Sequence, residues 1–437
     1  MSEPRRPSAP LPRSPSYYSA SLLEESDYPV LEGDHRVDVA IVGGGFTGVA
    51  TAVELTERGY RVAVVEANRV GWGASGRNGG QVTGSLSGEA AMRRQMRRTL
   101  GEDAAEFVWN LRWRGHGIIR ERVAKYAIRC DLKHGHLQAA WQPSHLKALR
   151  EDFEASQEHW IGEHLHWLDR AQVGELIGTR RYHGAIRNDY NMHLHPLNLC
   201  LGEARAAAGR GAKIFEGSPV VAIEHGPTPA VLGERGRVAA DSVILAGNAY
   251  HRLERRRLGG RLFPASLGII ATAPLDDGTA QALNPEDLAV YDTRLVLDYY
   301  RLTADRRLLF GGGANYSGRD SADIAAELRP RLEATFPQLE GVPLDYQWQG
   351  MAGIVINRVP MVGRLSPNVY YAQGYSGHGI ATSHVMGEIL AEAIGGSLEA
   401  FDAFADIRHW RVPFGDRLGN ALLAAGMGYY RLRERLG

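Results

Sequence analysis

The clearest hydrophobic pattern in the chain lies between residues 37 and 66. Residues 37–42 form a short apolar run rich in β-branched side chains, and residues 60–65 form a second one. Between them, residues 46–58 carry helix formers with apolar positions on one face, and Gly59 follows where a helix commonly ends. The pattern predicts strand, helix and strand within about 30 residues, the size of one βαβ unit.

A glycine motif joins the first predicted strand to the helix. Gly43, Gly45 and Gly48 have the spacing G-x-G-x-x-G, which permits a tight turn, a close approach of pyrophosphate and close helix–strand packing. Glu66 ends the second strand, 18 residues beyond Gly48, where a carboxylate can bind ribose hydroxyls. We therefore predict a dinucleotide site; the alternative is a similar turn without a ligand.

The rest of the chain contains both helical and strand patterns of apolar residues. Helices are predicted at residues 89–100, 104–125, 143–160, 199–209, 321–336 and 380–394. Strands are predicted at 130–140, 213–224, 237–245, 264–273 and 369–372, and within 295–313 as antiparallel strands with a hairpin at 304–306. Strands cluster between helical stretches, and several of them alternate as antiparallel strands do. We therefore predict a second domain inserted between parts of the first.

Three further segments are rich in glycine, namely residues 71–81, 247–248 and 374–379. Such runs form poor helices or strands, but they let a backbone lie flat against a large planar ligand. The last of them opens the helix at 380–394, and a helix N-terminus favours a partial negative charge. Together the segments predict a flavin-sized footprint; the alternatives are a surface loop at 71–81 and an ordinary strand end at 247–248.

Bulk composition excludes several other classes of protein. Formal net charge is zero, so no overall field attracts nucleic acid. Cys130 and Cys200 offer no disulfide framework, and we expect both to be buried in a protein of a reducing, cytoplasmic compartment. No run approaches the roughly 18 apolar residues of a membrane span, and the first residues lack a secretory signal.

Two local patterns have mainly structural interpretations. Residues 1–15 are rich in Pro, Arg and Ser and are expected to be a disordered tail, whereas Tyr17 and Tyr18 predict that residues 16–29 fold onto the domain. Several histidines lie close together in sequence but lack the spacing and carboxylate support of a metal site, so we predict no metal: His134, His136, His159, His164 and His166.

The glycine-rich motifs and several further stretches resemble those of a known family. The chain resembles the D-amino-acid oxidase superfamily of FAD-dependent enzymes, and within it the γ-glutamylputrescine oxidases. The matching stretches beyond the βαβ unit run from residue 16 almost to the C-terminus: 16–18, 71–81, 193–198, 246–250, 297–305, 311–313 and 373–379. The glycine motifs are specific for the superfamily, and residues 193–198 and 298–305 favour the narrower branch.

The resemblance implies an α/β (α+β) fold of the D-amino-acid oxidase or glycine oxidase type. A discontinuous Rossmann-like FAD-binding domain would comprise residues 30–90, 192–252 and 355–437. An inserted substrate domain with an antiparallel sheet would comprise residues 91–191 and 253–354.

The resemblance also implies positions that contact FAD. By position, the pyrophosphate would lie on Gly43, Gly45, Phe46, Thr47 and Gly48, and the adenosine on Glu66, Ala67, Val221 and Gly247. The flavin would be lined by Gly73, Ser75, Gly76, Arg77, Asn78, Gly79, Gly80 and Gln81, with Gly377, His378 and Gly379 at its pyrimidine edge.

The activity implied is oxidation of an amine, such as a γ-glutamylated polyamine, to an aldehyde and ammonia or an amine. O₂ would be the acceptor and H₂O₂ the second product. Candidates around the reaction are His378, Tyr300 and Arg301, with His251 a weaker one. Arg301 could bind a substrate carboxylate or form a surface ion pair, and Tyr299 and Tyr300 alternate, so one of them can face the flavin. Alternatives are an oxidase of sarcosine, glycine or D-amino acids, a dehydrogenase that uses another carrier, and a non-catalytic FAD protein.

We predict that FAD is bound without a covalent link. Sarcosine oxidases attach their flavin to a cysteine ahead of the last glycine turn, and residues 301–379 contain no cysteine. Denaturing the purified protein in acid should release all yellow colour into the supernatant. Colour that stays with the precipitate would show a covalent bond.

Overall fold

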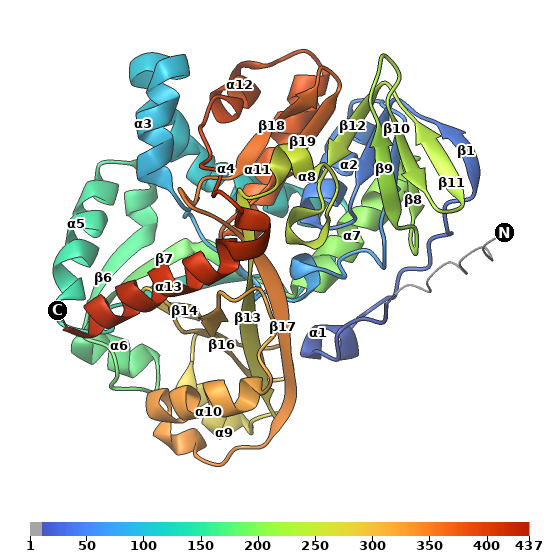
Figure 1. Ribbon diagram of the computed structural model, residues 1–437. Coiled ribbons are helices and arrows are strands. Elements are labelled where there is room, and N and C mark those ends of the chain that lie inside the picture. Colours follow the sequence, from blue (N-terminus) through green and yellow to red (C-terminus); the bar gives the residue numbers. More distant parts are fainter. Residues whose placement is uncertain (1–10, 437) are drawn as a thin grey trace.

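The computed structural model describes residues 11–436 and contains three β-sheets (Figure 1). The first is a six-stranded sheet in the order β18-β19-β12-β2-β3-β8. Its neighbouring strands run parallel, apart from the antiparallel β18–β19 pair. The strands are β18 (Met361–Ser366), β19 (Val369–Gln373), β12 (Ser242–Leu245), β2 (Val39–Val42), β3 (Val62–Val65) and β8 (Lys213–Phe215).

A smaller four-stranded sheet lies beside the first, at the right of Figure 1, in the order β1-β11-β10-β9. Its strands are β1 (Gly33–Arg36), β11 (Gly236–Ala239), β10 (Ala230–Gly233) and β9 (Val220–Glu224). This arrangement corrects two predictions. The expected strands 213–224 and 237–245 are each interrupted and divided between the two sheets, as β8 with β9 and β11 with β12.

The third sheet has nine strands and is mostly antiparallel, with β14 and β5 as a parallel pair. Eight strands follow the order β17-β13-β16-β15-β14-β5-β7-β4, and β6 pairs with β7. They are β17 (Leu344–Val355), β13 (Leu262–Thr272), β16 (Leu308–Asn315), β15 (Tyr299–Leu302), β14 (Ala289–Asp292), β5 (Lys133–Ala139), β7 (Gly184–His193), β4 (Gln81–Val82) and β6 (Leu165–Asp169).

The predicted helices are present, with ends shifted by a few residues. The helices that correspond to predicted ranges are α2 (Phe46–Glu57), α3 (Glu89–Leu100), α4 (Ala104–Lys125), α5 (His145–Gln157), α7 (Pro196–Gly209), α10 (Ile324–Thr335) and α11 (Gly379–Ile394). The others are α1 (Tyr17–Ala20), α6 (Arg170–Leu176), α8 (Arg255–Leu258), α9 (Asp277–Leu283), α12 (Glu399–Ala405) and α13 (Gly415–Leu436). Short 3-10 turns are η1 (Ala74–Gly76), η2 (Gly101–Asp103), η3 (Trp160–His164), η4 (Asn248–Tyr250) and η5 (Pro337–Leu339).

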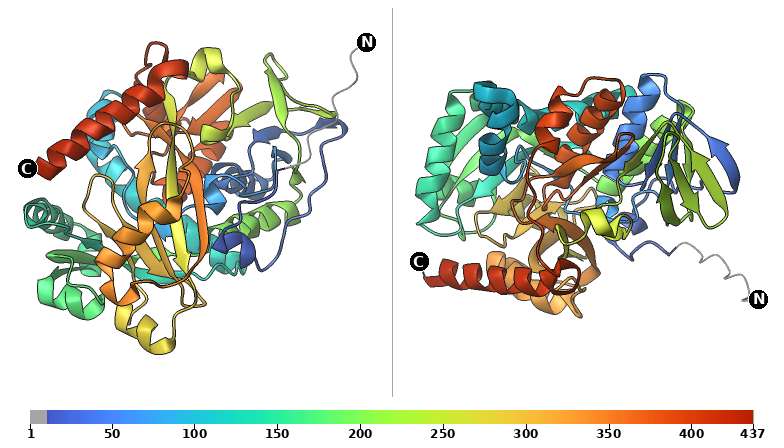
Figure 2. Two further views of the ribbon diagram at one scale, coloured as in Figure 1. Left: turned by 60° about the horizontal axis from the view of Figure 1, so that its bottom comes forward. Right: turned by 45° about the horizontal axis from the view of Figure 1, so that its top comes forward.

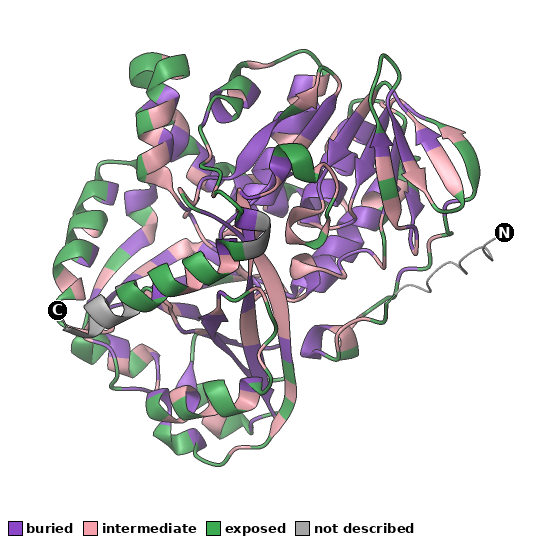
Figure 3. Cartoon of the chain, viewed as in Figure 1, coloured by how far each residue is buried: buried purple, intermediate pink, exposed green. Residues whose placement is uncertain are grey.

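Alternation along the nine-stranded sheet gives its two faces different environments. Tyr300, Val290 and Phe310 point into one hydrophobic cluster, which also takes residues from α6, α9 and α10. Tyr299 and Trp348 point to the opposite face and join the main core with α2, α7 and α11. Burial concentrates in the sheets and the helices between them, while α5 and α13 are largely exposed (Figure 3). The views in Figure 2 place α13 on the outside of the nine-stranded sheet.

The domain boundaries expected from sequence stay a prediction. All strands of the six-stranded sheet come from residues 39–65, 213–245 and 361–373. The nine-stranded sheet, in turn, draws β4 from residues 81–82, well before the expected boundary at 90. The two sheets therefore share one continuous segment between residues 62 and 82, which leads from one to the other.

The N-terminal expectation needs one correction. Residues 1–10 lie outside the described part of the chain, but residues 11–15 make specific contacts. The Arg13 guanidinium donates to the Glu25 carboxylate at 2.7 Å and to the Val70 carbonyl at 2.9 Å. Tyr17 and Tyr18 are buried, as predicted.

The described residues contain neither a candidate membrane span nor a candidate metal cluster. No helix between residues 11 and 436 is both long and apolar enough to cross a bilayer. Within the same range, no three His, Cys, Asp or Glu side chains are grouped as a metal would require. Cys130 and Cys200 are free and buried, as predicted.

A buried charge network ties together the helices that cover the six-stranded sheet. Arg122 of α4 donates to Glu203 of α7 at 2.8 Å and to Glu54 of α2 at 2.6 Å. His384 of α11 shares a 3.0 Å hydrogen bond with Glu203. Burial alone would raise the pKa of Glu203, but His384 and Arg122 outweigh it and lower that pKa.

We predict that Glu203→Leu destabilises the protein by about 3–5 kcal/mol, because it leaves the Arg122 charge buried with less compensation. Because the pKa of Glu203 is lowered by folding, its contribution to the free energy of unfolding is present above about pH 4–5 and is lost on acidification. Denaturant unfolding should show both effects. Glu102→Gln, which removes the exposed Arg97–Glu102 pair, is the control and should cost less than about 1 kcal/mol. Equal losses in both variants would contradict the prediction.

Candidate functional site

The turn between β2 and α2 brings backbone against backbone. A Cβ on Gly48 would overlap the carbonyl oxygen of Gly43, and Gly43 itself has φ +112°. A Cβ on Gly45 would lie 2.9 Å from the Ser75 hydroxyl. Gly45 is the N-cap of α2 and provides no side chain to cap it. The Phe46 N–H donates to Ser75, and the first-turn N–H groups after it stay available to an anion.

Glu66 stands at the end of β3, as predicted, beside this turn. Its carboxylate accepts from the Gly44 N–H at 2.7 Å and from the Asn68 N–H at 2.9 Å. Burial raises the pKa of Glu66, and the two backbone hydrogen bonds oppose that rise. The neighbouring Ala67 is exposed. Val221 on β9 is 57% exposed, so its predicted contact with adenine stays a prediction.

The glycine-rich segment 71–81 folds directly onto the turn. Gly71 N–H donates to the Gly44 carbonyl at 2.9 Å, and the Ser75 hydroxyl accepts from the Phe46 N–H at 2.9 Å. Within the segment, the Asn78 amide donates to the Ala74 and Ser75 carbonyls, both at 3.0 Å. A Cβ on Gly76 would overlap the Gly71 carbonyl oxygen, so this tight fold depends on glycine there.

The other end of this segment is fixed by the third sheet. The Trp348 indole N–H of β17 donates to the Arg77 carbonyl at 3.0 Å, and the Arg77 guanidinium lies 4.2 Å from the Trp72 ring centre. Gln81 begins β4 and donates to the carbonyls of Val290 and Tyr300. The structure therefore places residues 71–81 between the six-stranded and nine-stranded sheets.

Arg301 holds this segment in place, and its expected role is wrong. It is 1% exposed, and its guanidinium donates to the Gly79 carbonyl at 3.0 Å and the Leu194 carbonyl at 2.9 Å. Further donations reach the Leu302 carbonyl and the Tyr18 hydroxyl. With these partners it is neither a surface ion pair nor free to bind a substrate carboxylate.

Tyr300 was predicted to be catalytic, but the structure places it away from the site. Its ring packs between Phe310 and Phe336 in the cluster on the far face of the sheet. Tyr299 lies on the opposite face, against Gly79 and Gly311, where an added Cβ would overlap its ring. The alternation was predicted correctly, but sequence could not tell which tyrosine faces the site.

The remaining glycine-rich segments meet the same region. The Asn248 side chain accepts from the Gly374 N–H at 3.0 Å, and His251 shares a 2.9 Å hydrogen bond with Gln373. Tyr375 shares a 2.6 Å hydrogen bond with Thr47 in the first turn of α2. Segments 43–48, 71–81, 247–248 and 374–379 are thus linked by direct contacts.

His378 is the N-cap of α11, and no side chain caps this helix either. Burial, with Arg358 nearby, lowers the pKa of His378 to about 4, so the ring is neutral at physiological pH. Its Nδ1 atom is buried without a hydrogen-bond partner. Gly377 beside it has φ +100° and an open surface, and Gly379 begins the helix.

These observations fit a bound FAD. Two uncapped helix N-termini, those of α2 and α11, meet at the cradle that the glycines leave open. Arg77 Nε, His251 Nδ1 and His378 Nδ1 are buried without hydrogen-bond partners, which a polar cofactor can supply. Two side chains of this site were not expected from sequence: Tyr375, although it lies inside a quoted motif, and Trp348, which no motif marks.

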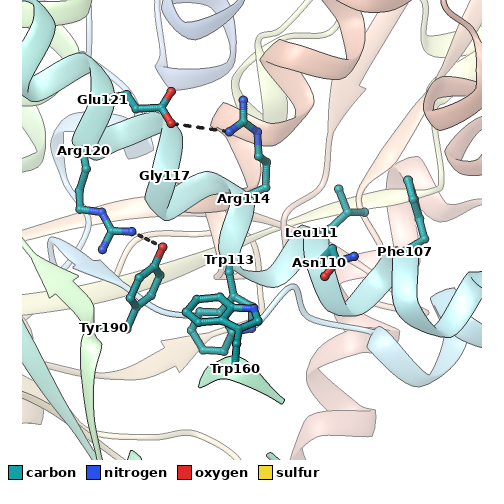
Figure 4. Close-up of a pocket in the computed structure, with 10 residues that line it drawn as sticks. All are labelled: Phe107, Asn110, Leu111, Trp113, Arg114, Gly117, Arg120, Glu121, Trp160 and Tyr190. Atoms are coloured by element: carbon teal, nitrogen blue, oxygen red, sulfur yellow. Dashed lines mark hydrogen bonds and ion pairs between the residues drawn. The ribbon is translucent and has the colours of Figure 1, made fainter. Parts of the chain in front are cut away.

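A surface hollow of about 550 Å³ lies elsewhere, along the outer side of α4 (Figure 4). Trp113, Trp160 and Tyr190 form its aromatic part, and Arg114 with Glu121 lies at its other end. None of its lining residues belongs to the four glycine-rich segments. The hollow is therefore separate from the cofactor cradle.

Two known proteins are similar to this chain over nearly its whole length. The family model described as "FAD dependent oxidoreductase" matches residues 38–393. A gamma-glutamylputrescine oxidoreductase of Escherichia coli (strain K12) is 41% identical over 425 residues, covering 97% of this chain and 98% of that protein. A probable oxidoreductase OrdL of Haemophilus influenzae is 36% identical over 425 residues, covering 96% of this chain and 97% of that protein.

Solved structures show the same fold. Glycine oxidase from Geobacillus kaustophilus superposes with a TM-score of 0.70 at 23% identity, covering 86% of this chain and all of that one. L-proline dehydrogenase from P. horikoshii also gives a TM-score of 0.70, at 19% identity, covering 87% of this chain and 98% of that one. The predicted fold class is confirmed.

We predict that Gly48→Ala abolishes FAD retention, because the added methyl group would force Gly43 and the α2 N-terminus apart. Overpacking of this kind costs about 1–3 kcal/mol, and here it falls on the anion-binding turn. The measurement is the ratio of flavin to protein absorbance after purification. Gly209→Ala, also in a helix but with open space around its Cα, is the control and should keep its flavin. Full flavin content in Gly48→Ala would contradict the prediction.

Proposed function

The chain belongs to the family of FAD-dependent oxidoreductases, and from this premise we propose that it oxidises a γ-glutamylated polyamine such as γ-glutamylputrescine. The products would be an aldehyde, ammonia or an amine, and H₂O₂. The observation that carries the proposal is the convergence of four glycine-rich segments on one cradle, in a chain 41% identical to a gamma-glutamylputrescine oxidoreductase over nearly its full length.

FAD, when bound, accepts two electrons and a proton from the carbon next to the substrate nitrogen. The residues of this chain would orient the cofactor and the substrate and exclude water from the site. The glycine turn at 43–48 would hold the pyrophosphate, and Glu66 would hold the ribose. Tyr299 lies on the site face of the sheet and would contact the substrate, while neutral His378 would lie near the pyrimidine edge.

One observation favours an amine over an α-amino acid as substrate. The Arg301 guanidinium, expected as a carboxylate ligand, is occupied by three backbone carbonyls and a tyrosine hydroxyl. An α-carboxylate next to the reacting carbon therefore gains nothing from it. This argues against sarcosine, glycine and D-amino acids, which carry that carboxylate.

Further parts of the proposal concern the cofactor bond, the acceptor and the compartment. We infer noncovalent FAD, O₂ as acceptor and a cytoplasmic location. The two buried free thiols are consistent with a reducing compartment. Peroxide measured per substrate turnover separates an oxidase from a dehydrogenase that uses another carrier.

We predict that γ-glutamylputrescine bleaches the flavin under anaerobic conditions, while sarcosine, glycine and D-alanine do not. The protein would be mixed with each compound without O₂, and absorbance near 450 nm followed, where oxidised flavin absorbs. Bleaching by an amino acid but not by the γ-glutamylated amine would overturn the proposed substrate. Bleaching by none of them would favour a non-catalytic FAD protein.

We also predict that kcat/KM rises with pH between about 7 and 10. The reacting amine must be neutral to lose a hydride, and a free alkylamine has a pKa near 10, like that of lysine. His378 does not add a step in this range, because its pKa is lowered to about 4. Initial rates at low substrate test this, and a flat profile would contradict it.

A further inference from the structure

A charged pair lies where α3 and α4 cover the end of the glycine-rich segment. The Arg112 Nε–H donates to the Gly84 carbonyl at 2.6 Å, and Arg112 Nε lies 3.6 Å from the Glu89 carboxylate. Gly84 follows Gln81 by three residues, a span of at most about 10 Å. The pair therefore lies close to the residues proposed to line the flavin.

The surroundings of Arg112 offer donors and aromatic surface. Its guanidinium lies 4.6 Å from the ring centre of Trp109 and 5.4 Å from that of Trp113. Both indole N–H groups are buried without a hydrogen-bond partner, which costs about 1–3 kcal/mol each if nothing else binds them. Arg112 donates one hydrogen bond within the described residues, through Nε, so its two terminal NH₂ groups suit a ligand that brings acceptors.

A row of aromatic side chains connects the pair with the flavin side of the sheet. Tyr291 of β14 is the direct cross-strand partner of Tyr299 of β15, so both project from the same face. The His136 ring of the next strand lies 4.8 Å from the Tyr291 ring and shares a hydrogen bond with Gln81. From β15 to β5 the distance is two strand spacings, about 10 Å.

The strand register places Tyr291 on the face of the sheet that α4 covers. Tyr291 pairs with Gln138, Gln138 pairs with Ile186, and Ile186 packs in one cluster with Trp109 and Trp113 of α4. Burial raises the pKa of the Tyr291 hydroxyl most, and Asp152 adds to this rise. Arg112 lowers the same pKa and Glu89 raises it, so both charges act on this hydroxyl. Tyr291 therefore lies on this face between its partner Tyr299 on β15 and the part of α4 that carries Arg112.

We propose that Arg112 and Glu89 bind the α-amino-acid head of the substrate, with its carboxylate on Arg112 and its ammonium on Glu89. The alkylamine chain would then run along Tyr291 and Tyr299 toward the flavin. A guanidinium binds a carboxylate through charge-assisted hydrogen bonds, and the partly buried position strengthens them. The inference rests on the proposed function and explains how a γ-glutamyl amine is distinguished from a free polyamine, which has no carboxylate.

The test is steady-state kinetics of the FAD-loaded protein with γ-glutamylputrescine and with putrescine. We expect Arg112→Gln to raise KM for γ-glutamylputrescine about tenfold or more with kcat changed less than about twofold, since a hydrogen bond to a charged group is lost. KM for putrescine should stay within about twofold. Glu89→Gln should act in the same direction, and Arg112→Lys should restore part of the loss.

Arg114→Gln is the matched control. Arg114 lies two residues further along α4, but it lines the hollow and pairs with Glu121 (Figure 4). It also pairs with Glu388. It should leave both substrates unaffected. FAD content and unfolding midpoint of each variant show whether the fold is intact; if Arg112→Gln does not fold, Glu89→Gln decides the matter.

Two failures can be told apart. If the wild-type protein oxidises γ-glutamylputrescine but Arg112→Gln and Glu89→Gln leave its KM unchanged, the head-group site is refuted and the proposed function stands. An equal rise in KM for putrescine would also refute it, because a structural role would affect both substrates. If the wild-type protein does not oxidise γ-glutamylputrescine, the proposed function fails and this inference fails with it.

Discussion

The architecture depends on one constraint, the close approach of backbone to backbone where a side chain would not fit. The start of α2 lies against the carbonyl of Gly43 because Gly48 has no Cβ, and segment 71–81 folds back on itself at Gly76 for the same reason. These contacts leave the N-terminus of α2 without a capping side chain from its own N-cap residue, Gly45. An anion-binding cradle results directly from the places where glycine is required.

Segment 71–81 lies between the two large sheets, and Arg301 of the nine-stranded sheet holds its far end. Its guanidinium, on β15, donates to the carbonyl of Gly79, just before β4, and to that of Leu194, just after β7. A fully buried arginine without a carboxylate partner is costly unless its hydrogen bonds are satisfied, and here four acceptors satisfy them. Arg301 therefore positions the loop that would line the flavin. The sequence suggested a substrate-binding role for this arginine and gave no sign of its structural one.

Sequence predicted local features well and long-range ones less well. The βαβ unit, Glu66 and the helices α3 and α4 follow from periodicity and capping, and the structure places them as expected. By contrast, residues 213–224 and 237–245 each divide between two sheets, because a hydrophobic run does not reveal where a strand changes partners. Likewise, alternation shows that Tyr299 and Tyr300 differ, but the packing of Phe310 and Phe336 decides which is buried away from the site.

The central claim is that separate glycine-rich segments form one FAD site, and titration of folded, flavin-free protein with FAD tests it most directly. Trp72 and Trp348 contact Arg77 of the cradle, so their fluorescence should report binding. The account predicts quenching that saturates at one FAD per chain, together with a bound-flavin absorption spectrum. Folded protein that shows neither quenching nor a flavin spectrum with excess FAD would contradict it.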